Sequence, residues 1–424
     1  MLERIQLHDG VFFNGISETK FKSSSIIINF VLPLTAETAC QQAILPYMLH
    51  NGFKECPDIT EFHKKLMDLY SATIITSVKK VGAYQIISMG IEFIEDEFVP
   101  EKISERAIEL LISSVFCPIM EKNNIFCEQI LKKQKEVLKE IVLSELNDKY
   151  IYTLNRCHEI AFEGTNCAVN SNGTISGIEN LTTKTVSESY FNMLKHAHIE
   201  ILGIGHVPTL EMAKNKLKKA FENFKGSPSL KLVPQEFNFR TQLKEETQEM
   251  NINQTKLALL FIGGYPHTEK EEAATKLMSI IYGGSPTSKL FVNVREKMGL
   301  CYYCSAMFNK SVGSLCVAAG IEQKNLEKAK NVICSEFKTM QNGDFTDKNL
   351  TTAKLTFKQK LHALSDSSNK LNHWYLARIL DQTFKSPEFF MELIDQITPQ
   401  ELVQQAEKFT LTTIYVLKGG GLID

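Results

Sequence analysis

The sequence predicts an α+β protein made of two homologous domains, each a mainly antiparallel sheet packed with helices. First, 424 residues exceed what one hydrophobic core comfortably organises, so two domains of similar size are expected. Second, short apolar strands separated by hairpin-scale loops are followed by pairs of helices, a pattern that argues against a doubly wound parallel sheet. Third, one strand–turn–helix order occurs twice along the chain.

The repeated unit begins with an apolar strand, at residues 25–32 in the first half and 256–262 in the second. From residue 30 to 52, and again from 261 to 283, the order is strand end, proline-containing turn, Thr/Glu helix start, alanine-bearing helix and glycine. The spacing is identical, and Ala43 matches Ala274. We interpret this as an internal duplication, although strand–turn–helix units can resemble one another by chance.

The domain boundary is expected just past the midpoint of the chain. Residues 225–234 combine Gly, Ser, Pro and Lys, a composition typical of linkers. We therefore predict an N-terminal domain over 1–224, a linker over 225–240 and a C-terminal domain over 241–424. Residues 128–162 are predicted to be mostly helical, because apolar positions recur there at helical spacing.

Composition and charge exclude several classes of function. With 47 basic and 49 acidic side chains, the chain has no field that would attract nucleic acid or an anionic membrane. No apolar run approaches the roughly 20 residues of a membrane span, and the N-terminus does not resemble a signal peptide. The ten scattered cysteines show no disulfide-like framework. We therefore expect a cytoplasmic protein.

The stretch 282–302 carries the most informative local pattern. A glycine pair lets the backbone turn, Ser285 can cap a helix, and Pro286 fits its first turn. Gly299 can end that helix before the next strand. Arg295 then lies in the last helical turn and Tyr302 at the start of the strand, close enough to share a site. Local physics alone also accommodates Arg295 as a solvated residue favoured by the helix dipole.

The whole string resembles the second-domain signature of the insulinase/pitrilysin/mitochondrial-processing-peptidase family. The shared features are the glycine turn, the run Ser-Lys-Leu-Phe, the Arg-Glu pair and the run Gly-Leu-x-Tyr. Residues 173–182 also resemble a segment of this family. The resemblance implies the LuxS/insulinase-like metallohydrolase fold in a clamshell arrangement. It also implies that Arg295 and Tyr302 reach toward the backbone of a bound substrate near the metal.

The zinc motif of that family, H-x-x-E-H on a first-domain helix, is missing. Its three positions correspond to Ala43, Pro46 and Tyr47, and the position of the third ligand to Glu140. Alanine has no donor atom, proline has no carboxylate, and a tyrosine phenol is protonated and a poor lone zinc ligand at neutral pH. As an alternative to a remnant ligand, Glu140 is an ordinary exposed helix residue. The sequence therefore predicts no metal and no cofactor.

Histidine and cysteine offer no obvious replacement. His50 lies near the degenerate helix but has no histidine or carboxylate partner three or four residues away. Cys301 and Cys304 form a C-x-x-C pair, yet in a regular strand residues three apart point to opposite faces. No second pair completes a four-cysteine zinc site.

The chain most resembles the bacterial YmfF-type group of the family, whose members lack the zinc motif. This implies a non-catalytic subunit that pairs with a zinc-containing homologue, forms a peptidase chamber, and helps to bind a peptide or protein substrate. Two alternatives remain: a scaffold protein with the same fold and no part in proteolysis, and an independent enzyme with relocated chemistry. The sequence also leaves self-association as a homodimer open.

Overall fold

The computed structural model describes residues 2–222, 226, 230, 232 and 242–419. The chain divides into two units, each assembled from three segments of the sequence. Unit 1 comprises Met1–Leu143, Val169–Val233 and Asp366–Phe384, and unit 2 comprises Ser144–Ala168, Pro234–Ser365 and Lys385–Asp424. The predicted linker, 225–240, lies almost wholly outside the described residues, so the predicted boundaries stay a prediction.

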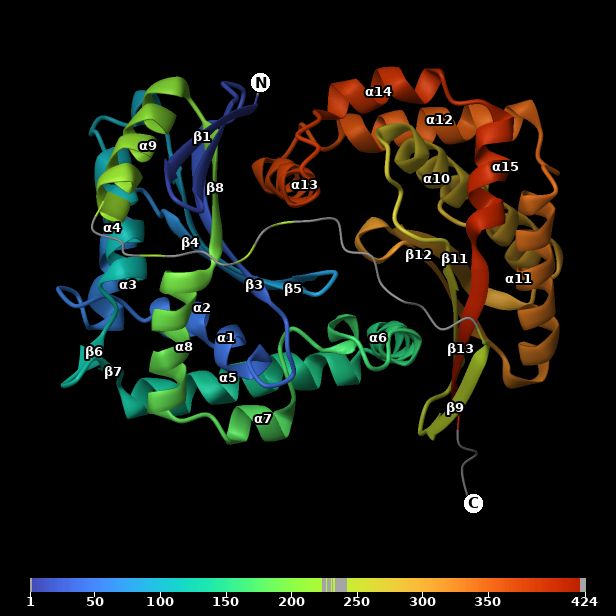
Figure 1. Ribbon diagram of the computed structural model, residues 1–424, viewed down its shortest axis with the longest axis horizontal. Coiled ribbons are helices and arrows are strands. Elements are labelled where there is room, and N and C mark those ends of the chain that lie inside the picture. Colours follow the sequence, from blue (N-terminus) through green and yellow to red (C-terminus); the bar gives the residue numbers. More distant parts are fainter. Residues whose placement is uncertain (1, 223–225, 227–229, 231, 233–241, 420–424) are drawn as a thin grey trace. The chain divides into compact units, whose positions relative to one another are not determined.

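Unit 1 is built on a sheet in the order β1-β2-β8-β3-β5-β4 (Figure 1). Every neighbouring pair is antiparallel except β2 and β8, which run parallel. A short hairpin of β6 and β7 lies apart from this sheet. The strands are β1 (Leu2–His8), β2 (Val11–Ser17), β3 (Ser23–Pro33), β4 (Thr73–Val81), β5 (Tyr84–Ile94), β6 (Met120–Glu121), β7 (Ile125–Phe126) and β8 (His198–Gly205).

Helices cover one face of this sheet and form the core of unit 1 with it. Ile26, Ile28 and Phe30 of β3 point into this core, and each is fully buried. Their neighbours along the strand point to the opposite face, because side chains alternate along a strand. The helices of unit 1 are α1 (Ala39–Ala43), α2 (Leu45–Leu49), α3 (Ile59–Asp68), α4 (Ser104–Phe116), α5 (Glu128–Asn147, to Leu143), α7 (Ile175–Glu179), α8 (Thr183–His196), α9 (Val207–Glu222) and α13 (Ser368–Leu380).

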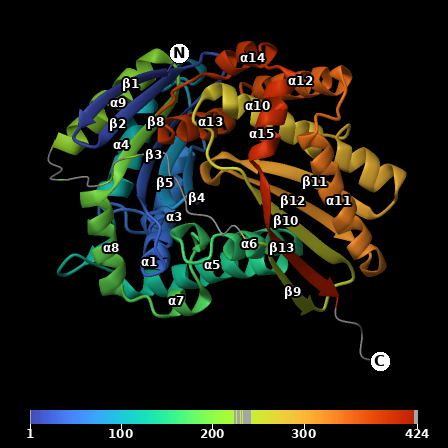
Figure 2. The same ribbon diagram turned by 45° about the vertical axis from the view of Figure 1, so that its right-hand side comes forward.

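Unit 2 has a sheet in the order β11-β12-β10-β13-β9 (Figure 2). Only β13 and β9 are parallel. Its strands are β9 (Lys244–Met250), β10 (Thr255–Ile262), β11 (Cys301–Asn309), β12 (Ser314–Ile321) and β13 (Thr410–Gly419). Its helices are α6 (Lys149–Ala161), α10 (Glu269–Tyr282), α11 (Leu326–Gln341), α12 (Asp347–His362), α14 (Pro387–Asp395) and α15 (Pro399–Lys408), with a π-helical segment, η3 (Leu290–Lys297).

The two sheets share one topology, which confirms the predicted α+β fold with two homologous domains. Strands β2, β8, β3, β5 and β4 correspond in order and direction to β9, β13, β10, β12 and β11, and β1 is an addition to the edge of unit 1. Residues 30 and 261, which the sequence predicts to be equivalent, lie in the corresponding strands β3 and β10. The predicted helical stretch 128–162 is also confirmed, as α5 and α6, with Asp148 capping the second helix.

The units exchange one helix each. Helix α6, from the first half of the chain, packs on β10 and β13 of unit 2, and α13, from the second half, packs on β8 of unit 1. The two helices hold equivalent places in the chain. Helix α6 follows β5, α4 and α5, and α13 follows β12, α11 and α12. Each sheet is therefore completed on one face by a helix from the other half of the sequence. In the described part of the chain, no helix is long and apolar enough to cross a membrane.

Candidate functional site

The degenerate zinc motif lies where the helix is interrupted. Helix α1 ends at Ala43 and α2 begins at Leu45, with Pro46 in its first turn. Proline has no backbone N–H, and its ring would clash with the carbonyl of Gln42, four residues earlier, so one helix cannot continue through this point. The segment that would carry H-x-x-E-H is thus two short helices.

The side chains at these positions belong to the core of unit 1. Ala43 is fully buried and Pro46 is buried, whereas Tyr47 is half-buried and packs against the core. None offers a carboxylate, imidazole or thiolate to a cation. Within the described residues, no three His, Cys, Asp or Glu side chains gather where they could hold a metal ion.

A pair of amides ties α5 to the degenerate motif. Gln134 of α5 is buried, and its Nε2 donates to Oδ1 of Asn51, 3.2 Å away. Asn51 Nδ2 in turn donates to the backbone oxygen of Tyr47 at 2.6 Å. Glu140, at the expected position of the third ligand, is exposed and has neither an ion pair nor a side-chain hydrogen bond in the described structure. Helix α5 therefore turns an amide, not a carboxylate, toward α2, and these residues do not fit a zinc ion.

Arg295 is held on the π-helical segment η3 of unit 2. Its guanidinium lies over the Phe291 ring, 4.6 Å from the centroid, and its Nε is 3.6 Å from Oε1 of Glu296. The side chain is 40% exposed, so its charged end can reach a ligand. Stacking on an aromatic face fixes the plane of the guanidinium and leaves its outer N–H groups available.

Tyr302 projects from a bulge at the start of β11. The pairing of β11 with β12 shifts by one residue between Cys301 and Tyr303, which leaves Tyr302 as the extra residue. A bulge re-aims the side chain that it carries. Tyr302 is 60% exposed, and its hydroxyl donates to Oε1 of Glu322 over 3.4 Å. The Arg295 and Tyr302 side chains, both in the described part of the chain, share no hydrogen bond.

The same bulge corrects the expectation for Cys301 and Cys304. Their thiols were expected on opposite faces of a regular strand, which is wrong, since they lie close enough to hydrogen-bond each other. That hydrogen bond, joined by the nearby charge of Arg295, lowers the pKa of Cys301 against the opposing effect of burial. The hydrogen bond and burial raise the pKa of Cys304. Arg295 therefore lies close enough to Cys301, the residue before Tyr302, for its charge to act on that thiol.

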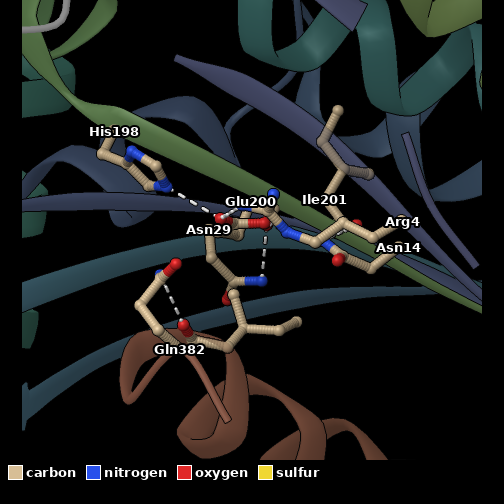
Figure 3. Close-up of polar contacts among 8 residues, drawn as sticks. Arg4, Asn14, Asn29, His198, Glu200, Ile201 and Gln382 are labelled. Atoms are coloured by element: carbon tan, nitrogen blue, oxygen red, sulfur yellow. Dashed lines mark hydrogen bonds and ion pairs between the residues drawn. The ribbon is translucent and has the colours of Figure 1, made fainter. Parts of the chain in front are cut away.

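The face of the unit 1 sheet opposite its core helices, which α13 partly covers, carries a cluster of polar groups (Figure 3). Glu200 of β8 is fully buried and binds Arg4 Nη2 at 2.5 Å, Asn14 Nδ2 at 2.8 Å and His198 Nε2 at 2.7 Å. Asn29 of β3 donates to the backbone oxygen of Glu200 at 3.0 Å. This polar cluster fixes β1, β2, β8 and β3 relative to one another.

The comparisons with known proteins agree with this geometry. Residues 180–357 match the family described as Peptidase M16 inactive domain. The chain is 26% identical over 417 residues to the "Probable inactive metalloprotease YmfF" of Bacillus subtilis, covering 97% of this chain and 96% of that protein. Its fold matches a conserved protein from Enterococcus faecalis over all of both chains, with a TM-score of 0.89 and 23% identity. It matches a protease from Helicobacter pylori over 99% of both chains, with a TM-score of 0.80 and 14% identity.

In sequence and in fold, the chain resembles the insulinase/pitrilysin-like peptidase family over nearly its whole length. It is YmfF-like in sequence, and the positions of that family's zinc motif hold an alanine, a proline and a tyrosine. The insulinase-like fold predicted from the sequence is thereby confirmed. The roles predicted for Arg295 and Tyr302 stay predictions, although both side chains are exposed on unit 2.

The polar residues at the interface between α13 and the sheet were not predicted from the sequence. Lys79 of β4 and His373 of α13 are in contact, and Asn372 lies beside them on the helix. The sequence did contain a signal for Lys79. Ile75, Ser77 and Lys79 are every second residue of one strand, so their side chains share a face of the sheet. What the alternation could not show is which element covers that face.

Proposed function

We propose that this chain pairs with a zinc-bearing homologue to form a peptidase chamber, in which Arg295 and Tyr302 help to bind and orient the peptide. The observation that carries the proposal is the contrast between the two motifs. The zinc positions are filled by buried or half-buried side chains without metal donors, whereas Arg295 and Tyr302 remain exposed on a stacked π-helical turn and a bulge.

The chemistry of this pair suits an amide substrate. A guanidinium and a phenol can both donate hydrogen bonds to a carbonyl oxygen, and donors placed where charge develops lower the barrier to attack at that carbonyl. The catalytic metal would come from the homologue. This chain would supply donors and part of the chamber wall.

The sheet edges offer a place for the peptide backbone. Among the residues that the structure describes, β4 pairs with β5 alone and β11 with β12 alone, so each ends its sheet with one side unpaired in the ladder. An extended peptide can add to such an edge through main-chain hydrogen bonds, which gives affinity with loose sequence preference. The setting that we propose is the cytoplasm, supported by ten free cysteine thiols.

The test combines the purified chain with a zinc-bearing homologue and follows cleavage of a fluorogenic peptide. We expect the mixture to cleave faster than the homologue alone. The Arg295→Ala variant should lower kcat/KM of the mixture on the order of 100-fold, the scale of removing one donor to a developing oxyanion. Tyr302→Phe, which removes only the hydroxyl, should give a smaller loss.

Arg106→Ala is the matched control. Arg106 is also an exposed arginine on a helix, 52% exposed and 3.8 Å from Glu101, and it lies on unit 1. Equal activity with and without the chain, unaffected by Arg295→Ala, would contradict the proposal and favour the scaffold alternative. Formation of a stable complex without any change in cleavage would do the same.

A further inference from the structure

We infer that unit 1 contains a binding site for a carboxylate with a neighbouring N–H donor, the chemistry of a peptide C-terminus or a free amino acid. The site is a hollow of about 210 Å³ between helix α13 and strands β3, β4 and β5. It lies within one unit, and the inference does not depend on pairing with a zinc-bearing homologue.

The register of the sheet builds the floor of the hollow. Asn29, Ser88 and Ser77 pair side by side across β3, β5 and β4. In the next row that faces the same way, Ile27 and Ile75 flank Gly90, which contributes no side chain. The floor is therefore polar in one row and apolar in the other.

One face of helix α13 forms the roof. The lining residues of the helix are Asn369, Asn372, His373 and Leu376, at positions i, i+3, i+4 and i+7. Because α13 begins at Ser368, its first turn lies at the hollow. Ser367 Oγ accepts from the backbone N–H of Lys370 in that turn, and the positive end of the helix dipole there favours an anion nearby.

The charge at the hollow is positive. Lys79 Nζ lies 3.0 Å from Nδ1 and 3.3 Å from Nε2 of His373. Burial lowers the pKa of Lys79, and burial with the charge of Lys79 lowers the pKa of His373. In the described structure Lys79 contacts no carboxylate, so a bound anion would relieve an uncompensated, partly desolvated cation.

Asn372 adds a second requirement. It is 6% exposed, its Nδ2 donates to Oγ of Ser25 at 3.1 Å, and its Oδ1 is buried without a hydrogen-bond partner. A buried polar atom without a hydrogen bond costs free energy, so a ligand N–H that donates to Asn372 Oδ1 would be stabilised there. A carboxylate for Lys79 and an N–H for Asn372 occur together in the last residue of a peptide and in an amino acid.

The size and lining of the hollow limit the ligand. It is smaller than the roughly 300 Å³ at which pockets for drug-sized molecules begin. Ile27, Ile75 and Leu376 offer apolar surface to a side chain. The geometry thus suits one residue with an aliphatic side chain.

The experiment titrates the full chain, without any partner, with alanyl-leucine, alanyl-leucine amide, free leucine and inorganic phosphate. Binding is followed by calorimetry and by the imidazole resonance that disappears in His373→Gln. We expect alanyl-leucine to bind and to shift that resonance, and the amide to bind about 10- to 100-fold more weakly, because it lacks the charged hydrogen-bond acceptor. Comparable binding of leucine would identify a free amino acid as the ligand, and binding of the dipeptide alone a peptide terminus.

Three variants separate the site from general effects. Lys79→Gln should weaken binding of alanyl-leucine about 10- to 100-fold. Ser77→Phe, which fills the hollow without changing charge, should abolish it. Lys80→Gln is the control, because Lys80 is the next residue of the same strand and donates to the backbone oxygen of Val169 instead.

Four results would overturn the inference. The first is that alanyl-leucine does not bind at concentrations up to about 10 mM, at which even a ligand this small should bind detectably. The second and third are that alanyl-leucine amide or inorganic phosphate binds as tightly as alanyl-leucine. The fourth is an unchanged affinity for alanyl-leucine in a folded Lys79→Gln variant.

Discussion

The faces beneath the two exchanged helices share one topology and differ in chemistry. Under α13, the row across β3, β5 and β4 reads Asn29, Ser88 and Ser77. The equivalent row under α6, across β10, β12 and β11, reads Leu260, Cys316 and Met307. One row is polar and borders a hollow, and the other carries apolar and sulfur-bearing side chains.

In this second row Leu260 is buried and Cys316 contacts α6, whereas Met307, at the edge of the sheet, is 62% exposed. Cys157 of α6 is fully buried, its thiol hydrogen-bonds that of Cys316, and it lies 3.8 Å from the backbone oxygen of Ala258. Polar contacts occur elsewhere on α6, where the hydroxyl of Tyr152 donates to Gln248 Oε1 at 2.9 Å. The helix is thus held mainly by close packing along β10 and β13, with the Cys157–Cys316 contact reaching β12.

The difference shows how a duplicated fold can divide its tasks. Polar side chains in a buried row stabilise a protein less than apolar ones unless each finds a partner. Asn29 and Ser88 do bind each other, at 2.8 Å, but Asn372 keeps an unpaired oxygen. We therefore attribute a mainly structural role to the face under α6, and a binding role to the face under α13.

The largest expected effect comes from the buried cluster next to the polar row. In Glu200→Ala, Arg4 loses its buried carboxylate partner and His198 loses a hydrogen-bond partner, and breaking a buried ion pair by removing one member costs about 3–5 kcal/mol. Urea unfolding followed by Trp374, the only tryptophan and a residue of α13, reports on unit 1. The exposed Glu140→Ala should change stability by no more than about 0.5 kcal/mol. A similar small change for Glu200→Ala would mean that the polar face is not a structural element of unit 1.

A reciprocal exchange tests the comparison directly. Leu260→Asn places an amide at a buried position among apolar and sulfur-bearing side chains. Burying this amide without hydrogen-bond partners should destabilise unit 2 by about 2–4 kcal/mol. Asn29→Leu removes hydrogen bonds to Ser88 and to the Glu200 backbone and should cost about 1–3 kcal/mol in unit 1. Circular dichroism measures the whole chain, and Trp374 fluorescence separates unit 1. If Leu260→Asn is the milder change, the two faces do not differ as described.

The pH dependence of unit 1 should report the His373 site with a smaller effect. Burial and Lys79 lower the pKa of His373 in the folded chain, whereas the unfolded residue titrates near ~6.5. The unfolded state then binds more protons, so this contribution is intact above pH ~6.5 and is lost as pH falls below it. His373→Gln should flatten the fall of the Trp374 unfolding midpoint between pH ~7 and ~5.5. His50, whose pKa burial and His63 also lower, gives a fall of the same sign, so His50→Gln serves as the comparison.

The sequence was sufficient for the fold, because the evidence for it is local. The matched spacing around residues 30 and 261 predicted two equivalent strand–helix units, and apolar strands such as 25–32 predicted the sheets. The exchange of α6 and α13 was not foreseen. An amphipathic pattern shows that a helix buries one face, but not which sheet that face will meet.

For the site, residue identity was predictable and geometry was not. The loss of zinc ligands at Ala43, Pro46 and Tyr47 followed from side-chain chemistry alone. The bulge that carries Tyr302 and brings Cys301 to Cys304 depends on how β11 pairs with β12, which no local pattern reveals. The hollow could not be predicted from the sequence either, because Lys79 and His373 are 294 positions apart and meet only when α13 packs on the sheet.

Thiol labelling tests how tightly α6 packs on its sheet, and it perturbs the protein least because it leaves the sequence unchanged. Cys117 is exposed and should react with a maleimide at once. Cys157 is fully buried, and its hydrogen bond to Cys316, together with burial, raises its pKa well above the usual value. Both effects deplete the accessible thiolate, which is the reactive species. Mass spectrometry of peptides should therefore find Cys157 unmodified until denaturant unfolds unit 2. Rapid native labelling of Cys157 would show that α6 separates readily from its sheet, and the contrast between the two faces would then be one of mobility, not of packing.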